Sequence, residues 1–283
     1  MNNYKISCVM TTYRRFTCVE RSIAMFLNQD CKEGKELIIF NTDDEYPLIL
    51  GDSLKQHTNI IVINNNIDYI TKKPYDNVGS VRRDAITHAT GTHYICWDDD
   101  DIFLPWNNRQ CMDGIQRFPE AWAWKPEKSS FWNSESKIEI TGNAMEASII
   151  SRLDKIKEYG FREHKGGGEH WSWLQVFMDY RKIVHDYNSV PGYCFNWSDQ
   201  GTIRGHKQSG TLDHPDNFNI HKQGTKDIAV RPLETYSVNT LNAIYIKFII
   251  LIKNNVDKPI DNYNISQSNY NAYVQPYEYL LNT

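Results

Sequence analysis

The sequence predicts an α/β fold in which a mostly parallel sheet is covered on both faces by helices. Up to residue 104, short runs rich in Ile, Val and Leu alternate with segments of helical periodicity. The runs are continuously apolar, which is typical of strands buried on both faces. Polar or acidic residues follow directly behind several of them, including four consecutive acids at 98–101. Open α/β sheets bind ligands at the carboxyl ends of their strands, so we expect a ligand site there.

The first half of the chain supplies four strands and two helices. One helix is expected over 14–29, where Phe16, Val19 and Ile23 share a face, and another over 78–89. The expected strands cover 6–10, 37–40, 60–63 and 94–97. Strands and helices that alternate in this way form units with parallel strands.

After residue 105 the character of the sequence changes. All eight tryptophans lie between 97 and 197, and the strand-like pieces at 121–125 and 137–141 carry polar residues. We therefore expect a mixed, partly antiparallel continuation of the same sheet. Two further helices are expected, over about 169–180 and about 232–253.

Composition restricts the class of protein. The chain has 283 residues, which suits one large or two small domains. Its net charge of -4, from 31 Lys+Arg and 35 Asp+Glu, excludes a global basic field that would attract nucleic acid or anionic membranes. The six cysteines show no CxxC spacing, so we expect free thiols in a reducing environment. With no visible secretion signal and no apolar run long enough to span a bilayer, a soluble, cytoplasmic protein is expected.

The acidic run Asp98-Asp99-Asp100-Asp101 is the most informative stretch of the chain. Four adjacent carboxylates repel one another, so a folded protein keeps them at a strand end only if something positive compensates them. A Mg²⁺ or Mn²⁺ ion shared with ligand phosphates is the usual compensation. A solvated acidic loop is the alternative. The run lies between an apolar strand and the apolar segment 102–106, which favours the metal site.

Four motifs in order resemble the inverting glycosyltransferases of family 2, which have the GT-A fold. They lie at 7–13, 77–84, 91–95 and, with the Asp-x-Asp pattern, 98–102. The resemblance is clear over about 5–106, patchier to about 206 and absent beyond. It implies a Rossmann-like three-layer αβα sandwich with a mostly parallel central sheet and a helical C-terminal extension. The implied domains are a nucleotide-sugar-binding half (1–106), an acceptor-binding half (107–207) and the extension (208–283).

The resemblance also implies the chemistry: a metal-dependent transfer of a sugar from a nucleoside-diphosphate sugar, a UDP-sugar first, to an acceptor hydroxyl with inversion. Asp98 and Asp100 are the implied Mn²⁺ or Mg²⁺ ligands, and Asp98 and Asp99 the implied ribose contacts. Asn41 stands where the family has an acid that pairs with uracil, and this departure leaves the base open. The remaining implied nucleotide contacts are Thr11, Thr12, Tyr13, Asp43 and Arg83. Arg82 is then expected in solvent or in a salt bridge.

The segment Gly166-Gly167-Gly168-Glu169-His170 resembles the Gly-Glu-Asp stretch that opens the acceptor-side helix in this fold. There the Asp deprotonates the acceptor hydroxyl. Here His170 stands in its place, so either Glu169 or His170 is the expected general base, and histidine is suited to the role by its near-neutral pKa. Two alternatives remain: a retaining reaction that needs no base, and a structural role for Glu169 in the first turn of the helix.

A polar, Gly-punctuated loop at 198–206 resembles a mobile active-site loop. The GT-A resemblance makes His206 the candidate third metal ligand, with His185 in reserve. Arg204 is the candidate clamp on the diphosphate. Of the tryptophans at 171, 173 and 197, one is expected to contact ligand.

Three other functions remain open. A sugar-phosphate nucleotidyltransferase shares this layout, but the Gly-rich loop that it usually carries after the first strand is missing from Thr11-Thr12-Tyr13. A non-catalytic, Ca²⁺-dependent carbohydrate-binding protein would leave the nucleotide-half motifs unexplained. The third keeps the transfer chemistry but changes the acceptor, from a glycan to hydroxymethylated bases of viral DNA, for which the Asn-rich composition is only a hint.

Overall fold

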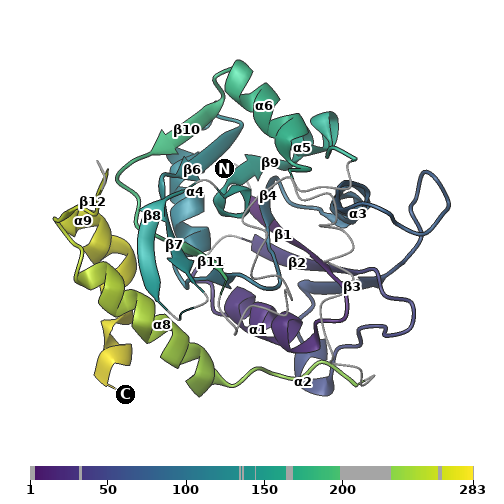
Figure 1. Ribbon diagram of the computed structural model, residues 1–283, viewed down its shortest axis with the longest axis horizontal. Coiled ribbons are helices and arrows are strands. Elements are labelled where there is room, and N and C mark those ends of the chain that lie inside the picture. Colours follow the sequence, from purple (N-terminus) through teal and green to yellow (C-terminus); the bar gives the residue numbers. More distant parts are fainter. Residues whose placement is uncertain are drawn as a thin grey trace.

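The computed structural model describes residues 4–31, 34–133, 135, 137–143, 145–163, 168–197, 231–260 and 263–282. A seven-stranded sheet forms its centre (Figure 1). Its strands, in spatial order, are β10 (Ile183–Asp186), β6 (Ala123–Pro126), β9 (Ile150–Arg152), β4 (His93–Cys96), β1 (Lys5–Thr12), β2 (Gly34–Asn41) and β3 (Ile60–Asn64). All neighbours pair in parallel except β9, which is antiparallel to both β4 and β6.

Helices separate the strands along the chain. In chain order they are α1 (Phe16–Leu27), α2 (Asp52–Lys55), α3 (Val78–Ala85) with the 3₁₀ turn η1 (Ile86–His88), α4 (Asn107–Arg117), α5 (Leu153–Tyr159) and α6 (Trp171–Asp179). Every residue of β1 from Ile6 to Thr12 is buried, so side chains on both faces of the sheet are covered. The structure thus confirms the predicted α/β fold with a mostly parallel central sheet.

One predicted strand belongs to a different sheet. The segment 137–141 was expected to continue the central sheet, but β8 (Ile138–Gly142) lies in a second, four-stranded sheet with β7 (Lys128–Trp132), β11 (Tyr193–Asn196) and β5 (Ile102–Phe103). The chain leaves the central sheet after Glu127, whose backbone N–H still donates to Asp186 O on β10 at 3.0 Å. From Lys128 onward it pairs with β8 instead.

The two expected halves of the catalytic unit share one sheet, because β9 from the second half lies between β4 and β6. A division at residue 106 stays a prediction. Within β1 and β4, the side chains of Cys8 and Cys96 are buried as expected. All six cysteines are free.

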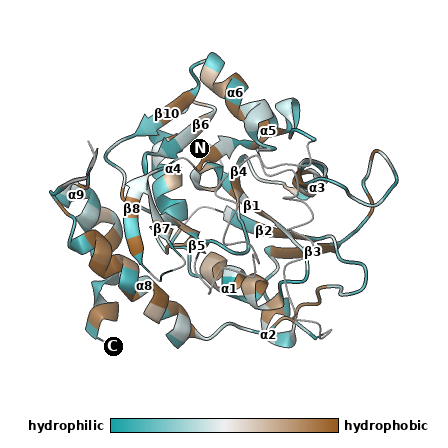
Figure 2. Cartoon of the chain, in the orientation of Figure 1, coloured by the Kyte–Doolittle hydropathy of each residue, from teal (hydrophilic) through white to brown (hydrophobic). Residues whose placement is uncertain are grey.

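The C-terminal extension is helical, as predicted, and its described part packs on the rest of the protein. Its main helix, α8 (Val238–Lys253), was expected from about 232 but begins at Val238, where the Ser237 side chain accepts from Thr240 N and caps it. The preceding residues are extended because Leu233 pairs with Leu50. Six apolar or aromatic side chains at helical spacing bury one face of α8 against the second sheet and α1 (Figures 1 and 2): Leu241, Ile244, Tyr245, Phe248, Ile249 and Ile252.

Short elements complete the described chain. They are the 3₁₀ turn η2 (Glu146–Ser148), the hairpin strands β12 (Pro259–Ile260) and β13 (Tyr263–Asn264), the helical turn α9 (Gln267–Asn269), the π-helix η3 (Tyr270–Val274) and the 3₁₀ helix η4 (Gln275–Asn282). Among the described helices, none is long and apolar enough to cross a membrane.

Lys128 joins the extension to the catalytic unit. Its side chain is buried, and Nζ donates to the carbonyl oxygens of Tyr187 at 2.6 Å, Ser189 at 3.2 Å and Asn264 at 2.9 Å. Two segments distant from Lys128 in sequence, 187–189 and the one around Asn264, therefore share one cation through charge-assisted hydrogen bonds.

We predict that Lys128→Met lowers the free energy of unfolding by about 2–3 kcal/mol, because three carbonyls, that of Ser189 in a buried position, lose their donor. Chemical denaturation measures the change. Lys137→Met is the matched control, since Lys137 is exposed and its ion pair with Glu139 spans 3.2 Å on the surface. That variant should stay within about 1 kcal/mol of the native protein. Equal losses in the two variants would contradict the role given to Lys128.

Candidate active site

The acidic run lies at the carboxyl ends of β1 and β4. These strands pair in parallel up to Val9 and Cys96, and Trp97 N still donates to Val9 O at 3.0 Å. Residues 98–101 and the segment behind Thr12 therefore emerge side by side at one edge of the sheet. This is the edge at which the sequence predicted a ligand site.

Two buried arginines compensate the middle of the run. Arg15 Nη1 donates to Asp99 Oδ1 at 2.8 Å and to Asp100 Oδ2 at 3.0 Å. Thr12 Oγ1 donates to Asp99 Oδ2 at 2.6 Å, and Arg21 Nη2 donates to the carbonyl oxygen of Asp100 at 2.9 Å. Burial raises the pKa of the Asp99 carboxyl, and the charge of Arg15 opposes that rise.

The two outer acids of the run differ from each other in exposure, because Asp98 is partly exposed and Asp101 is buried. The Asp98 side chain is 20% exposed, whereas those of Asp99 and Asp100 are 3% and 1% exposed. Asp101 accepts from Tyr193 OH and from Asn196 N, which fixes the turn into the second sheet. Among the four acids, Asp98 is thus the one that a ligand can reach most readily.

Arg82 connects the acidic run to the predicted base segment. Nη2 donates to Asp98 Oδ1 at 2.9 Å, and Nε lies 2.6 Å from Glu169 Oε1. Nη1 contacts the sulfur of Cys96. The guanidinium is almost fully buried, and the nearby carboxylates outweigh burial and hold its pKa above the ordinary value.

The start of α3 explains this placement. The Asn77 side chain accepts from Ser80 N at 2.7 Å and caps the helix. A Cβ at Gly79 would stand 2.0 Å from the carbonyl oxygen of Arg162, so only glycine lets the chain before α6 pack on this first turn. Arg82 lies three residues further along the same helix and reaches Glu169.

Arg83 was the residue expected at the nucleotide, but the structure places Arg82 beside the acidic run. Arg83 pairs with Asp68 and Asp84, each at 2.9 Å, and with Glu163. Consecutive residues of a helix point about 100° apart, so the two guanidiniums diverge. A nucleotide contact by Arg83 stays a prediction.

Glu169 and His170 immediately precede α6. Gly168 has φ 86°, and a Cβ there would lie 2.7 Å from the Trp171 ring, so this position requires glycine. Trp171 N donates to Gly168 O at 3.1 Å and closes the turn. Both Glu169 and His170 are buried.

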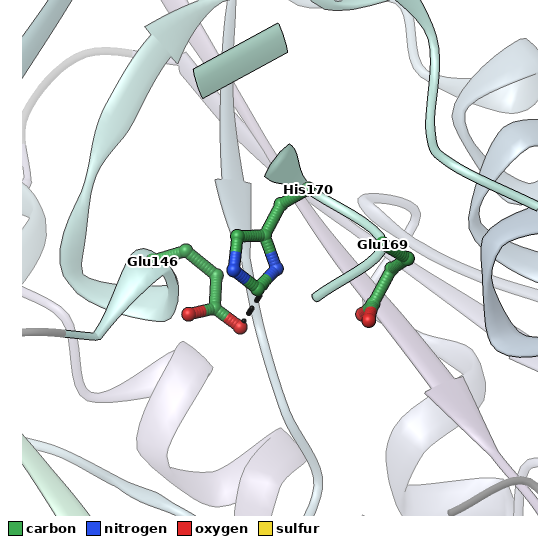
Figure 3. Close-up of side chains that lie close together, drawn as sticks. All are labelled: Glu146, Glu169 and His170. Carbon is green, nitrogen blue, oxygen red and sulfur yellow. Dashed lines mark ion pairs between the residues drawn. The ribbon is translucent and has the colours of Figure 1, made fainter. Parts of the chain in front are cut away.

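His170 has an acidic partner that the sequence did not suggest. Its Nδ1 lies 3.0 Å from Glu146 Oε1, and Figure 3 shows the imidazole between Glu146 and Glu169. Burial alone would lower the pKa of His170, but the negative charge of Glu146 outweighs it and the net shift is upward. The ligand-type atoms of Glu146, Glu169 and His170 lie within 4.8 Å of one another, a spacing that could also hold a metal ion.

Two of the residues expected at the nucleoside, Asn41 and Asp43, hold the loop that follows β2. Asn41 Nδ2 donates to Asn64 Oδ1 at 2.9 Å, and Asn41 Oδ1 accepts from Asp43 N at 3.2 Å. Asp43 pairs with Arg14, whose guanidinium carbon lies 5.1 Å and 4.7 Å from the ring centroids of Tyr13 and Tyr46. Thr11 is buried at the end of β1. The structure thus brings these residues to the same sheet edge as the acidic run, with Asn41 and Asp43 engaged in holding the loop.

The remaining candidates are dispersed or fall outside the described residues. Arg204 and His206 lie in the range 198–230, outside the part of the chain that the structure describes. His185 pairs with Glu127 on β10. Of the three tryptophans, Trp173 is buried and Trp171 is 43% exposed, while Trp197 packs on Phe195.

Sequence reasoning missed Arg15 and Glu146. Arg15 lies two residues behind Tyr13, at a strand end that was already assigned to the site, and this was a usable signal. Glu146 gave none, because it lies in a loop between β8 and β9 without any motif around it.

The donor set fits a divalent cation at Asp98. In the described part of the site, six carboxylates stand against the guanidiniums of Arg15, Arg21 and Arg82: Asp98, Asp99, Asp100, Asp101, Glu146 and Glu169. Hard divalent cations prefer carboxylate oxygens, and Asp98 is partly exposed. Asp100 as a second ligand stays a prediction, since its Oδ2 accepts from Arg15 in this structure.

Comparisons with known proteins identify the family and agree with the fold. The model of glycosyl transferase family 2 matches residues 7–162, more than half of the chain. The chain therefore belongs to glycosyl transferase family 2, as the motifs predicted, and is a glycosyltransferase. No curated protein sequence gave a match.

Solved structures show the same fold at low identity. TarS 1-349 from S. aureus with UDP-GlcNAc has a TM-score of 0.52 at 15% identity, over 87% of this chain and 71% of that chain. Its complex with UDP has a TM-score of 0.50 at 13% identity, over 87% and 70%. These likenesses confirm the predicted GT-A fold.

We predict that Arg15→Met lowers the free energy of unfolding by about 3–5 kcal/mol near pH 8, because it leaves Asp99 and Asp100 buried without their cation. The loss should be smaller at pH 5. A carboxyl whose pKa is raised in the folded state, as that of Asp99 is, costs stability only as the pH rises through that pKa. Denaturation at the two pH values measures both effects.

Arg117→Met serves as the control, since Arg117 is 55% exposed and pairs with Asp186 at 3.0 Å. It should change stability by less than about 1 kcal/mol at either pH. A loss in Arg15→Met that does not depend on pH would contradict the proposed electrostatic cause.

Proposed function

We propose that the protein transfers a sugar from a nucleoside-diphosphate sugar to an acceptor hydroxyl, with inversion and with the help of a divalent cation. The observation that carries this proposal is the double contact of Arg82 with Asp98 and Glu169. It brings the acidic run of the nucleotide-binding half and the base segment of the acceptor-binding half into one buried cluster. A transferase needs both within reach of one anomeric carbon.

The donor belongs on the side of Asp98. A cation held by Asp98, with Asp100 and His206 as the other predicted ligands, would neutralise charge that develops on the leaving diphosphate. Thr11, Thr12 and Tyr13 are the proposed ribose and base contacts, and Arg204 the proposed diphosphate clamp. The TarS complexes with UDP and UDP-GlcNAc make UDP the first base to test.

The acceptor belongs on the side of Glu169 and His170. One of these two removes the proton of the acceptor hydroxyl as the oxygen attacks the anomeric carbon from the face opposite the leaving group. Arg82 holds Asp98 and Glu169 in a fixed relation, so donor and base are positioned before the acceptor arrives. A glycan is the first acceptor class to assay.

Donor binding tests the role of Asp98. A thermal-shift assay with UDP, UDP-sugars and Mn²⁺ should show stabilisation of the native protein that depends on the cation. Asp98→Asn should lose most of it, because a carboxylate that faces both cation and ribose is gone. Asp52→Asn, at a fully exposed position in α2, is the matched control and should behave as the native protein. Undiminished stabilisation of Asp98→Asn by donor and Mn²⁺ would refute the site.

Two neighbouring arginines offer a second test. Arg82→Lys keeps the charge but loses the planar fork that contacts Asp98 and Glu169 together, so kcat should fall by about 10²-fold or more. Arg83→Lys should change kcat by less than about 3-fold, since its partners Asp68 and Asp84 lie away from the acidic run. Steady-state kinetics of the pair measures this. A larger fall in kcat for Arg83→Lys than for Arg82→Lys would favour Arg83 as the nucleotide contact.

A further inference from the structure

We propose that Glu146 is a positioning residue that makes His170, and not Glu169, the general base. The inference rests on the proposed transfer reaction and adds to it a residue outside every motif of the sequence. Glu146 belongs to η2, between β8 and β9, whereas His170 immediately precedes α6. The fold brings the two side chains together from positions 24 residues apart.

The two side chains form a close, buried ion pair, without the N–H alignment of a hydrogen bond. Glu146 Oε1 lies 3.0 Å from Nδ1 of His170 (Figure 3). A carboxylate this close stabilises the protonated ring, and Nε2 is the nitrogen proposed to accept the proton. The His170 and Glu146 side chains are 6% and 16% exposed, so their attraction is weakly screened by water.

Glu169 is less suited to the same task. Its Oε1 is in contact with Arg82 Nε at 2.6 Å, and its side chain is 7% exposed. To accept a proton it would have to give up part of a buried ion pair, which costs free energy at the moment of reaction. Its charge does help His170, because a second carboxylate beside the imidazole stabilises the protonated ring.

In the proposed step, one proton moves from the acceptor to His170. The acceptor hydroxyl gives its proton to Nε2 of His170 while its oxygen forms a bond to the anomeric carbon of the donor. The bond from that carbon to the diphosphate oxygen breaks, and the nucleoside diphosphate leaves with the electron pair. His170 becomes an imidazolium facing Glu146, which neutralises it. Nothing is oxidised or reduced.

The charged groups around His170 set the expected pH dependence. Glu146 from η2 and the adjacent Glu169 raise the pKa of His170, whereas burial and Arg82 from α3 lower it. The rings of Trp171 and Trp173 also lie beside the imidazole, with centroids 6.4 Å away. A base acts only when neutral, so kcat/KM should fall as the pH drops through a pKa above 6.5.

The test compares Glu146→Gln with the native enzyme. The substitution keeps the size of the side chain but removes its charge, so the contribution that raises the pKa of His170 is lost and burial remains. The acid limb of the kcat/KM profile should move to lower pH. At pH 8, kcat should fall by about 10- to 100-fold, while the donor dissociation constant stays within about 2-fold. His170→Ala should lose about 10²–10⁴-fold in kcat.

Glu127→Gln provides a matched control. Glu127 contacts Nδ1 of His185 on β10 at 2.5 Å. The substitution therefore removes the charge of a carboxylate beside a different histidine. It should leave both kcat and the pH profile unchanged. A Glu146→Gln variant with the native pH profile and rate would overturn the proposal, as would a His170→Ala variant that keeps more than half of the native kcat.

Two measurements separate this inference from the proposed function. If the native protein neither binds nor uses any donor with Mn²⁺, the proposed function fails and the inference falls with it. If the native protein transfers sugar but Glu146→Gln behaves as Glu127→Gln does, only the inference fails. Titration with Mn²⁺ alone should give the same affinity for native and Glu146→Gln proteins; a lost site would show that Glu146, Glu169 and His170 hold a metal ion and would overturn the assignment of a base.

Discussion

The ion pairs of one buried guanidinium organise this molecule's site. Arg82 contacts Asp98 just behind β4 and Glu169 just before α6, so two carboxylates share one cation. A buried arginine with a single carboxylate would leave the second acid without a cation, and such an uncompensated charge is strongly destabilising. The close packing of α3 on the segment before α6, which Gly79 permits, is therefore a condition for the whole cluster.

Charge also bears on the order of binding in the proposed reaction. The described part of the site holds more carboxylates than guanidiniums, so a diphosphate that arrives alone meets net repulsion. A divalent cation changes that balance, since it can share oxygens of Asp98 and of the diphosphate. Arg15 bridges Asp99 and Asp100, Arg82 pairs with Asp98, and Tyr193 and Asn196 donate to Asp101, which explains how four adjacent acids are held at a strand end.

The sequence predicted those parts of the fold that depend on local pattern. The parallel strands, most helix positions and the acidic run at a strand end all follow from apolar runs and the residues behind them. The placement of β8 in a second sheet did not follow, because a polar strand matches either sheet until its partner is known. Which of Arg82 and Arg83 lies beside the acidic run depends on the direction in which α3 packs. The contact of Glu146 with His170 depends on the position of η2, which no sequence pattern marks.

Glu169 and His170 show why adjacent residues in a motif need not share a role. They are consecutive in the chain and both are buried, yet one faces a guanidinium from α3 and the other a carboxylate from η2. Glu169 is held in a buried ion pair, whereas the anion beside the imidazole of His170 raises its pKa and strengthens it as a base. The chemistry of each residue is thus decided by partners from distant parts of the sequence. Where the family motif has an aspartate, this chain has a histidine, and Glu146 is the added group through which a histidine gains basicity at that position.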